Sequence, residues 1–555
     1  MKSKTQHRIT AAQAIVKMIK NEGIVKVFCV PGESYLPVLD AIYDEEAIEL
    51  IAARHEGGAS FMAEGWAKAS GKPGVVMATR GVGGSNLAIG VHTAFQDSTP
   101  LVVFLGQVDS RFRGREGFQE VDLDQFFKHI AKWTVEITDP KRVPELVGRA
   151  FRVAQTGRPG PVVVSLPENI LMAEIQLATF PRVTCPRPAP SAVEVEQVGR
   201  MLADAKKPLI IAGGGVIRAN AEEALQHFAE KQHIPVMAAF RRHDVFPNQH
   251  ELYAGHLGLG TPTVILQRVK EADLIIAVGT RLSEVTTQDY TLISAEQLLI
   301  HVDISAETLG KVYPPDLGIA ADAREALNAF LELEVLNDYS DWARRLRTGY
   351  EQVAAFPSSS PQGTLTNERI MEVLQTHLPP DAILTNDAGN FAGWLHRFYQ
   401  FKRKKTYIGP TSGAMGYGLP AAIGAKLAHP NRTVVSLSGD GGMMMTVQEL
   451  ETAVRYHIPV ISLVFNNGMY GTIRMHQELH YPKRVIGTSL NMINFAELGM
   501  ALGAKGFTVT TLEEFEQSLL EALASDYPSV VDIRTDPEQI SVNLTIADLR
   551  QKVAP

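Results

Sequence analysis

The chain contains almost no cysteine, with only Cys29 and Cys185 among its 555 residues. Two thiols cannot build the disulfide framework of a small secreted domain, and Cys29 lies in the apolar run VFCV, where a buried, inert thiol is expected. Excess positive charge is also missing, because the formal net charge is −8. The chain therefore offers no general basic field to nucleic acid or to an anionic membrane. We expect a reducing, cytoplasmic location and no nucleic-acid partner.

Long apolar runs are absent as well. No run reaches the roughly 18 residues of a membrane span, and the basic start MKSKTQHRIT is not followed by the apolar region of a signal peptide. Glycine and proline, at 45 and 31 residues, are near average usage, which argues against collagen-like and disordered classes. We expect no membrane segment. At roughly 100 to 200 residues per domain, the length predicts about three globular domains.

Amphipathic stretches alternate with short apolar runs in three successive blocks of the chain. This alternation predicts three α/β domains, each a doubly wound parallel sheet, over residues 1–180, 190–335 and 360–545. The segment 181–191 contains four prolines and is expected to link the first two domains. A polar stretch over 337–364, with FPSSSPQG inside it, is expected to form the second connection and to contain one helix.

The third block carries the most informative motif. The apolar run TVVSLS ends in Gly439, Asp440, Gly441 and Gly442, and the later run VISLVF ends in two asparagines, of which Asn467 stands 27 positions after Asp440. The carboxyl ends of parallel strands meet at one edge of the sheet, so the two motifs are expected to lie together. A carboxylate, an amide oxygen and a carbonyl suit Mg²⁺ that also binds a diphosphate. Either half alone is also explained by a turn or a helix cap.

Together the two motifs resemble the magnesium and diphosphate motif of the thiamine-diphosphate-dependent enzymes. The resemblance implies thiamine diphosphate and Mg²⁺ as cofactors, with Asp440, Asn467 and the backbone carbonyl of Met469 as metal ligands. It implies a larger set of residues that contact the cofactor: Glu56, Gly413, Met415, Gly439, Asp440, Gly441, Gly442, Asn467, Met469 and Tyr470.

Glu56 and Met415 have specific roles in this resemblance. Glu56 follows an apolar strand and opens a helix rich in glycine and alanine, as the glutamate that activates the cofactor's aminopyrimidine ring does in the family. A carboxyl in an apolar setting can share a proton with a ring nitrogen, whereas a glutamate stabilised by the helix dipole is the structural alternative. Met415, in TSGAMGYGLPAAIGAK, corresponds to the residue that bends the cofactor in the family. The carbonyl of Gly413 corresponds to the group that accepts a hydrogen bond from the cofactor's exocyclic amine. The structural alternative for Met415 is an ordinary core methionine.

Nearly the whole chain resembles the acetohydroxyacid synthases, also called acetolactate synthases, through stretches such as VPGESYLPVLDAI, ARHEGGASFMAEGWAKASGKPGV and GRPGPVVVSLPENI. The resemblance implies pyrimidine-binding, central and diphosphate-binding domains, in that order. It implies decarboxylation of a 2-oxo acid such as pyruvate and ligation of the acyl group to a carbonyl acceptor. It also implies a homodimer or homotetramer in which Glu56 of one chain faces Asp440 of another.

Several positions depart from the synthase pattern. Glu168 stands where a synthase carries lysine, Val285 stands where it carries arginine, and the segment after Asn467 lacks the family's tryptophan. These departures leave open a 2-oxo acid decarboxylase or an acyloin lyase, then a flavin-dependent pyruvate oxidase, and last a non-catalytic relative. The candidate substrate-pocket residues are Gly32, Gln107, Phe118, Gln119 and His476.

Two further questions stay open from the sequence. The run AGGGVIRAN, with Arg158 and Asp322, could hold the adenylate of FAD, or its glycines could form a tight turn. His476, Gln477 and Glu478 could act as acid or base if their segment closes over the site, or they could be exposed helix residues. His55 and His92 are expected to be packed histidines, and no spacing of histidine or cysteine predicts a zinc site.

Overall fold

The computed structural model describes residues 8–176, 181–334, 337–357 and 365–552. Part of the expected second connection, residues 358–364, lies outside the described residues, as do residues 1–7 of the basic start. The described chain forms three six-stranded sheets in which every strand pairing is parallel, and a short antiparallel pair of β1 (Arg8–Thr10) and β8 (Glu174–Gln176). The predicted fold class, three parallel-sheet α/β domains, is confirmed.

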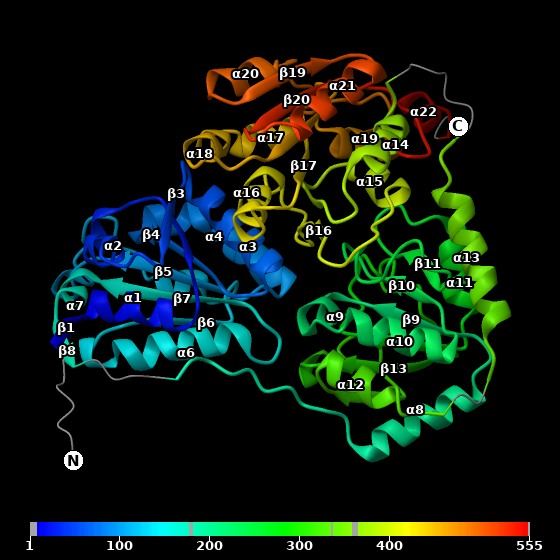
Figure 1. Cartoon of the computed structure of the whole chain (residues 1–555), viewed down its shortest axis with the longest axis horizontal. Helices are drawn as coiled ribbons and strands as arrows, with labels where there is room; N and C mark the ends of the chain where they lie inside the picture. Colours follow the sequence, from blue (N-terminus) through cyan, green and yellow to red (C-terminus); the bar gives the residue numbers. More distant parts are fainter. Residues whose placement is uncertain (1–7, 177–180, 335–336, 358–364, 553–555) are drawn as a thin grey trace.

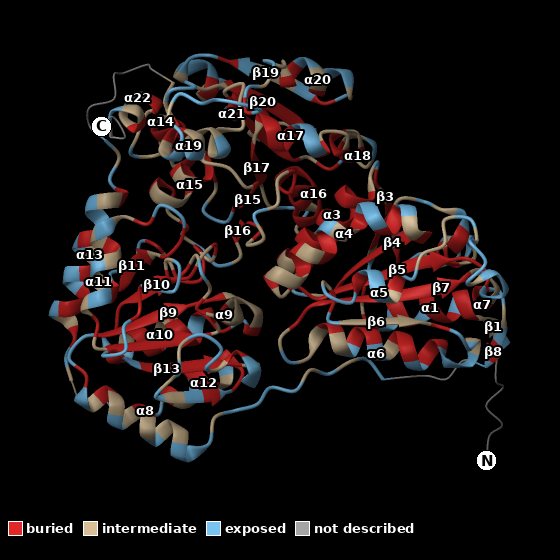
Figure 2. Cartoon of the chain, turned by 180° about the vertical axis from the view of Figure 1, so that it is seen from behind, coloured by how far each residue is buried: buried red, intermediate tan, exposed pale blue. Residues whose placement is uncertain are grey.

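The N-terminal sheet has the strand order β3-β2-β4-β5-β7-β6. Strands β5 and β7 are buried along their whole length, because helices cover both faces of a parallel sheet (Figure 2). The strands are β2 (Lys26–Cys29), β3 (Glu49–Ala52), β4 (Gly74–Thr79), β5 (Leu101–Gln107), β6 (Trp133–Glu136) and β7 (Pro161–Pro167). The helices are α1 (Ala11–Asn21), α2 (Leu36–Tyr43), α3 (Glu56–Ser70), α4 (Arg80–Asp97), α5 (Leu123–Phe127), α6 (Val143–Gln155) and α7 (Glu168–Leu171).

The central sheet has a different order, β11-β10-β9-β12-β13-β14. Its strands are β9 (Pro208–Ala212), β10 (Val236–Ala238), β11 (Tyr253–His256), β12 (Leu274–Val278), β13 (Leu298–Asp303) and β14 (Leu317–Ala320). Its helices are α8 (Ala192–Asp204), α9 (Gly214–Ala219), α10 (Glu222–Gln232), α11 (Thr263–Glu271) and α12 (Ala323–Phe330). The helix expected in the second connection is α13 (Ser340–Ala354).

The C-terminal sheet has the order β16-β15-β17-β18-β20-β19. Its strands are β15 (Ile383–Asn386), β16 (Tyr407–Ile408), β17 (Val434–Gly439), β18 (Ile461–Asn466), β19 (Lys505–Val509) and β20 (Ser529–Arg534). Its helices are α14 (Asn367–His377), α15 (Ala392–Phe398), α16 (Gly418–Ala428), α17 (Asp440–Thr446), α18 (Glu449–Arg455), α19 (Gly471–His480), α20 (Phe495–Ala501), α21 (Leu512–Leu523) and α22 (Ile546–Lys552). The sequence missed β16 and β19, because one has two residues and the other is an edge strand without a continuous apolar run.

The N-terminal and C-terminal domains pack against each other through α3 and α16 (Figure 1). Glycines allow this close approach: an added Cβ at Gly65 would lie 2.5 Å from the Ala421 carbonyl oxygen, and one at Gly424 would lie 2.0 Å from the Met62 carbonyl oxygen. The sequence predicts one half-site around Glu56 and another around Asp440. Backbone contact between α3 and α16 therefore fixes how the two half-sites of one chain lie relative to each other.

Asp97, at the end of α4, connects all three domains. Its buried carboxylate accepts from Lys68 Nζ at 2.7 Å and from the backbone N–H of Thr411 at 2.9 Å, and Arg242 Nη2 lies 3.4 Å away. Burial by itself would raise the pKa of Asp97, but the charges of Lys68 and Arg242 outweigh it and lower the pKa. In the part of the chain that the structure describes, no helix is both long and apolar enough to span a bilayer.

Candidate active site

Asp440 opens α17 directly after β17, whose last residue, Gly439, pairs with Phe465 of β18. The carboxylate is 6% exposed, and its Oδ1 accepts from the Gly441 N–H at 2.9 Å. Its Oδ2 is buried and has no hydrogen-bond partner. Burial raises the pKa of Asp440, and the backbone N–H groups of Gly441, Gly468 and Met469 act in the opposite direction.

The turn after β18 brings the second motif to the same edge. Met469 donates its N–H to Asn467 Oδ1 at 3.3 Å, and Gly468 has a φ of +68°, which glycine adopts without strain. The Tyr470 ring occupies the space beside Gly441, where an added Cβ would lie 2.5 Å from it. The preceding Asn466 is a structural residue, since its amide donates to the Ile493 carbonyl and to Asp532.

These residues fit a divalent cation. A buried carboxylate oxygen without a donor is costly unless a ligand satisfies it, and Asp440 Oδ2 is such an atom. The Asn467 side chain and the Met469 carbonyl stand on the adjacent turn, so the set offers the hard oxygen ligands that Mg²⁺ prefers.

The segment before α16 lies beside this edge. Gly413 and Gly416 have φ values of +70° and +75°, and the Gly416 carbonyl accepts from Thr446 of α17 at 2.7 Å. Nothing lies within 4 Å of the position that a Cβ on Gly413 would take, and Met415 is half-buried. The residues expected to bend the cofactor and those expected to bind its diphosphate are thus in one region of the C-terminal domain.

Asp387 was not among the predicted site residues. It is buried next to the start of α16 and next to the glycines that begin α17. Its Oδ1 accepts from the Gly418 N–H, and an added Cβ at Gly442 would lie 2.2 Å from its Oδ2. Burial raises the pKa of Asp387 to about 6. The available signal was its position at the end of the strand run AILTND, on the same sheet edge as Asp440.

Glu56 is held by its own domain. His55 caps α3 by accepting from the Gly57 N–H at 3.0 Å, and Glu56 follows as the first helical residue, 8% exposed. Asn86 of α4 donates to Glu56 Oε2 at 3.0 Å, and an added Cβ at Gly83 would lie 3.2 Å from Oε1. Asn86 was missed, because nothing in its local sequence indicates which carboxylate it meets.

Glu449 reaches from α18 across the domain boundary to the residues that precede Glu56. Its fully buried carboxylate accepts from the N–H groups of Arg54 and His55 at 3.2 and 3.0 Å. Burial raises the pKa of Glu449 to about 7. From the sequence, Glu449 was predicted only as part of a helix, since its partners lie almost 400 positions away.

Four of the five candidate substrate-pocket residues gather around the start of α4. An added Cβ at Gly32 would lie 2.5 Å from Thr79 Cβ, and the Gly81 N–H donates to the Gln119 carbonyl at 3.1 Å. Gln107 is buried and donates to the Val121 carbonyl at 2.9 Å. Phe118 is exposed, and the Arg80 guanidinium lies 5.7 Å from its ring centroid.

His476 does not join this group. It is exposed on α19, where its ring stacks on His480. The neighbouring Glu478 is buried and bound by Arg474 and Arg550. The hydrogen bond from Arg550, against the effect of burial, lowers the pKa of Glu478 to about 2, so this carboxylate is ionised near neutral pH and does not suit an acid role.

The residues considered for FAD make contacts of their own within the chain. Added Cβ atoms at Gly213 and Gly215 would lie 2.3 Å from the Gly279 oxygen and 2.6 Å from the Gly279 Cα, so both glycines permit backbone packing between two turns. Arg158 donates to Ser98 Oγ at 2.8 Å, and Asp322 caps α12. These contacts account for the glycines as a tight turn, the second of the two interpretations that the sequence left open.

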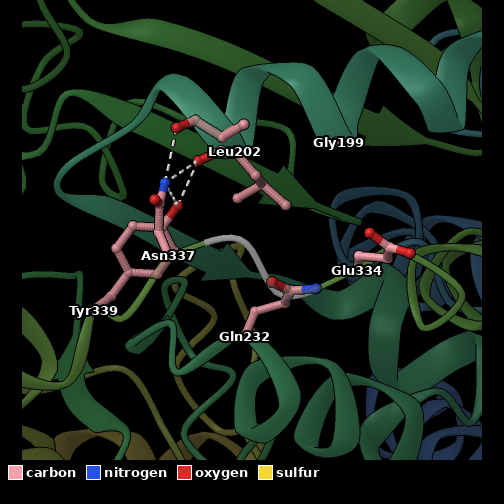
Figure 3. A pocket seen from close by; sticks show the side chains of 7 residues that line it. Gly199, Leu202, Gln232, Glu334, Asn337 and Tyr339 are labelled. Carbon is pink, nitrogen blue, oxygen red and sulfur yellow. Dashed lines mark hydrogen bonds between the residues drawn. The ribbon is translucent and has the colours of Figure 1, made fainter.

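A small cavity lies away from these motifs, between α8, α10 and the start of the second connection (Figure 3). Asn337 donates to the carbonyls of Leu202 and Ala203 at 3.2 and 2.8 Å, which closes the cavity on one side. Its volume of about 10 Å³ suits a single water molecule at most, so we assign it no functional role.

Comparison with known families and proteins agrees with this geometry. Three family models match successive parts of the chain: the thiamine pyrophosphate enzyme N-terminal TPP binding domain over residues 9–126, the central domain over 195–330 and the C-terminal TPP binding domain over 387–533.

Similar proteins cover almost the full length. The probable acetolactate synthase large subunit of Methanocaldococcus jannaschii is 34% identical, with 95% of this chain and 92% of that protein aligned. The acetolactate synthase large subunit of Corynebacterium glutamicum is 34% identical over 96% and 87%, and that of Lactococcus lactis subsp. lactis is 33% identical over 96% and 93%. With all three domains matched in order, the chain belongs to the thiamine pyrophosphate enzyme family.

Proposed function

We propose that this protein catalyses the thiamine-diphosphate-dependent decarboxylation of a 2-oxo acid such as pyruvate and the ligation of the acyl group to a carbonyl acceptor, as an acetolactate-synthase-like transferase. The observation that carries the proposal is the buried, unpartnered Oδ2 of Asp440 beside the turn of Asn467 and Met469. The decarboxylase and acyloin-lyase alternatives are not favoured, because relatives over nearly the whole chain are named as synthases.

The proposed roles follow from the chain's own geometry. Asp440, Asn467 and the Met469 carbonyl would hold Mg²⁺ and, through it, the diphosphate, beside the glycine-rich start of α17. Glu56 would hold a proton at the aminopyrimidine ring, oriented by Asn86. Thiamine diphosphate, when bound, supplies the electron sink that allows CO₂ to leave a 2-oxo acid.

We also propose that two copies of the chain complete each site. Glu56 contacts α4 of its own domain, and Asp440 contacts its own sheet edge. Exposed apolar side chains flank both half-sites: Val82 and Ile89 on α4, and Met444 and Met445 on α17. Such patches beside polar motifs are typical of interfaces, which supports a homodimer or a homotetramer built from dimers. Both cysteines are free thiols, which supports a cytoplasmic location.

Product analysis tests the reaction directly. Protein loaded with thiamine diphosphate and Mg²⁺ is supplied with pyruvate alone and with pyruvate plus benzaldehyde. Acetolactate or a mixed acyloin is the expected product. Release of free aldehyde with neither ligation product would contradict carboligation.

Glu56→Gln tests the activation step. Turnover is expected to fall by at least about 100-fold, because a neutral amide cannot exchange a proton with the ring. Glu145→Gln, on the exposed part of α6, is the matched control and should keep full turnover. Full turnover in Glu56→Gln would overturn the assigned role.

Co-expression of two inactive variants tests the shared site. In a mixed dimer of Glu56→Gln and Asp440→Asn chains, one of the two sites has both native residues if each site is formed between subunits. Random pairing then restores about a quarter of native activity. A mixture as inactive as the separate variants would show that each site is formed within one chain.

A further inference from the structure

Arg80 forms a charge cluster next to two of the candidate substrate-pocket residues, Gly32 and Phe118. Its side chain is 8% exposed and reaches carboxylates from two other loops: Glu33 Oε1 lies 3.1 Å from Nη1, and Glu168 bonds to Nη2. Nη1 also donates to the Phe118 carbonyl at 3.3 Å. The four loops that follow β2, β4, β5 and β7 thus converge on one buried guanidinium, at the sheet edge where ligands bind in parallel sheets.

Two observations indicate that this cluster serves a ligand. Arg80 Nε is buried and has no hydrogen-bond partner, so one donor of a tightly held guanidinium is left unsatisfied by the described chain. Arg80 also has a φ of +39° and the neighbouring Gln119 a φ of +62°, a left-handed conformation that is strained for a non-glycine residue. Strain of this kind persists where the surrounding structure imposes it, and it clusters at binding sites.

The cluster stands close to the proposed catalytic glutamate. Arg80 is the first residue of α4, and Gly83, whose added Cβ would lie 3.2 Å from Glu56 Oε1, follows three residues later. Three helical residues span about 4.5 Å along the axis. A small carbonyl compound held by Arg80 would therefore lie beside the residue that activates the cofactor.

The charge of the cluster selects among carbonyl compounds. One guanidinium and two carboxylates carry a net charge of −1, and both carboxylates reach solvent, with side-chain exposures of 65% for Glu33 and 36% for Glu168. The donor's carboxylate leaves as CO₂, so the charge that stays beside the cluster is that of the acceptor. A second 2-oxo acid would bring its carboxylate next to Glu33 and Glu168, whose like charges repel it, while the charge of Arg80 is already compensated.

We infer that the Arg80–Glu33–Glu168 cluster makes this enzyme select an uncharged aldehyde or ketone as acceptor in preference to a second 2-oxo acid, with Arg80 Nε donating to the acceptor's carbonyl oxygen. This inference rests on the proposed function. In the ligation, the donor's bond to the departing CO₂ breaks and leaves its electron pair on the acyl carbon, and this pair forms the new bond to the acceptor's carbonyl carbon. The acceptor's C=O electron pair moves to the oxygen beside Arg80, and a proton from water completes the alcohol.

A competition between two acceptors of similar shape tests the inference. The holoenzyme receives pyruvate as donor, with pyruvate itself and butane-2,3-dione competing as acceptors, and the two ligation products are quantified. We expect the product of the uncharged dione to exceed acetolactate by at least about tenfold. We expect Glu168→Gln and Glu33→Gln each to lower this ratio by about three- to fivefold, the size of a partly exposed charge interaction.

Controls separate charge from general damage. Glu145→Gln removes an exposed carboxylate from α6 and should leave the ratio unchanged. Arg80→Met should lower the yield of both ligation products relative to CO₂ released, because the donor to the acceptor oxygen is lost. A native ratio near one that Glu168→Gln does not change would overturn the inference while leaving the proposed function intact. Absence of CO₂ release from any 2-oxo acid would instead overturn the proposed function, and the inference with it.

Discussion

The N-terminal and C-terminal sheets share one strand order but hold opposite charges at equivalent positions. Numbered along each domain, both sheets run 2-1-3-4-6-5. In both, the third strand lies beside the first, and a helix begins directly at its end: α4 with Arg80 in one and α17 with Asp440 in the other. The shared topology determines where a ligand-facing residue stands, and the residue type determines which ligand it can meet.

The two residues also differ in how the chain satisfies them. Arg80 is compensated by two carboxylates from its own domain and adopts a left-handed backbone, whereas Asp440 has an ordinary φ and a buried oxygen without a partner. We therefore propose that the N-terminal position meets an uncharged ligand group and the C-terminal position a cation. Variants of both positions and of the contacts around them can test this difference.

The largest effect is expected at the unpaired carboxylate. Asp440→Asn should weaken thiamine diphosphate binding in the presence of Mg²⁺ by at least about 100-fold, because loss of a direct ligand costs more than the 10- to 100-fold typical of residues behind it. Calorimetric titration of dialysed protein measures the affinity. Asp526→Asn, exposed in the same domain, should bind normally. If the Asp440 variant and the native protein bind thiamine diphosphate with equal affinity, Asp440 is not a metal ligand.

A smaller effect is expected at Glu449, which connects the C-terminal domain to the residues that precede Glu56. Glu449→Ala leaves the N–H groups of Arg54 and His55 without their acceptor, and should lower the free energy of unfolding by about 2 kcal/mol. Turnover should fall by about tenfold, with cofactor affinity retained, because α3 and Glu56 lose their positioning. Thermal unfolding and steady-state kinetics measure the two effects.

The control for this variant lies on the same helix. Glu451→Ala removes a partly exposed carboxylate that pairs with Arg54 and Arg455, and should change stability by less than about 1 kcal/mol. If both glutamate variants behave alike, Glu449 has no special connection to the N-terminal half-site.

The boundary between the central and C-terminal domains should respond to acid. Burial, with a contribution from Arg397, lowers the pKa of His256 to about 4, and burial also lowers the pKa values of its neighbours His243 and His396. The folded protein then binds fewer protons than the unfolded chain, so stability present above pH 6.5 is lost as pH falls toward 4. His256→Phe should reduce the loss of Tm over this range, whereas His129→Phe, at an exposed position, should not.

The smallest effect concerns the strained backbone of Arg80. Glycine tolerates a φ of +39° and alanine does not, so Arg80→Gly should be more stable than Arg80→Ala by about 1 kcal/mol, although both lose the same ion pairs. Paired thermal melts compare the two variants. Equal stability would show that the left-handed conformation at the start of α4 carries no strain.

Local sequence patterns predicted the α/β fold class and part of the candidate site. The glycine-rich strand end at Asp440 and the asparagine pair that ends at Asn467 could be found from the sequence, because each motif is contiguous and follows a recognisable apolar strand. The α/β class followed from alternating apolar and amphipathic runs. The strand β6 was missed because its four residues are only half-buried and give no apolar run.

Contacts between distant segments could not be found in this way. Asp387 touches the backbone around Gly418 and Gly442, and Glu449 touches the backbone before Glu56; each was visible in the sequence only as an acid within a regular element. Glu168 was recognised as a reversed charge, but its partner Arg80 was not, because the pairing joins loops 88 positions apart.

The sequence by itself determined the class of fold, since this depends on hydrophobic periodicity. It also contained the contiguous motifs whose family resemblance implies the order of the domains and the residues that would hold a metal and a diphosphate. Tertiary structure alone decided which charges are compensated. The packing of sheets and helices brings four loops to Arg80, buries Asp440 Oδ2 and places Glu449 across a domain boundary. Burial and neighbouring groups then decide how stable each charge is.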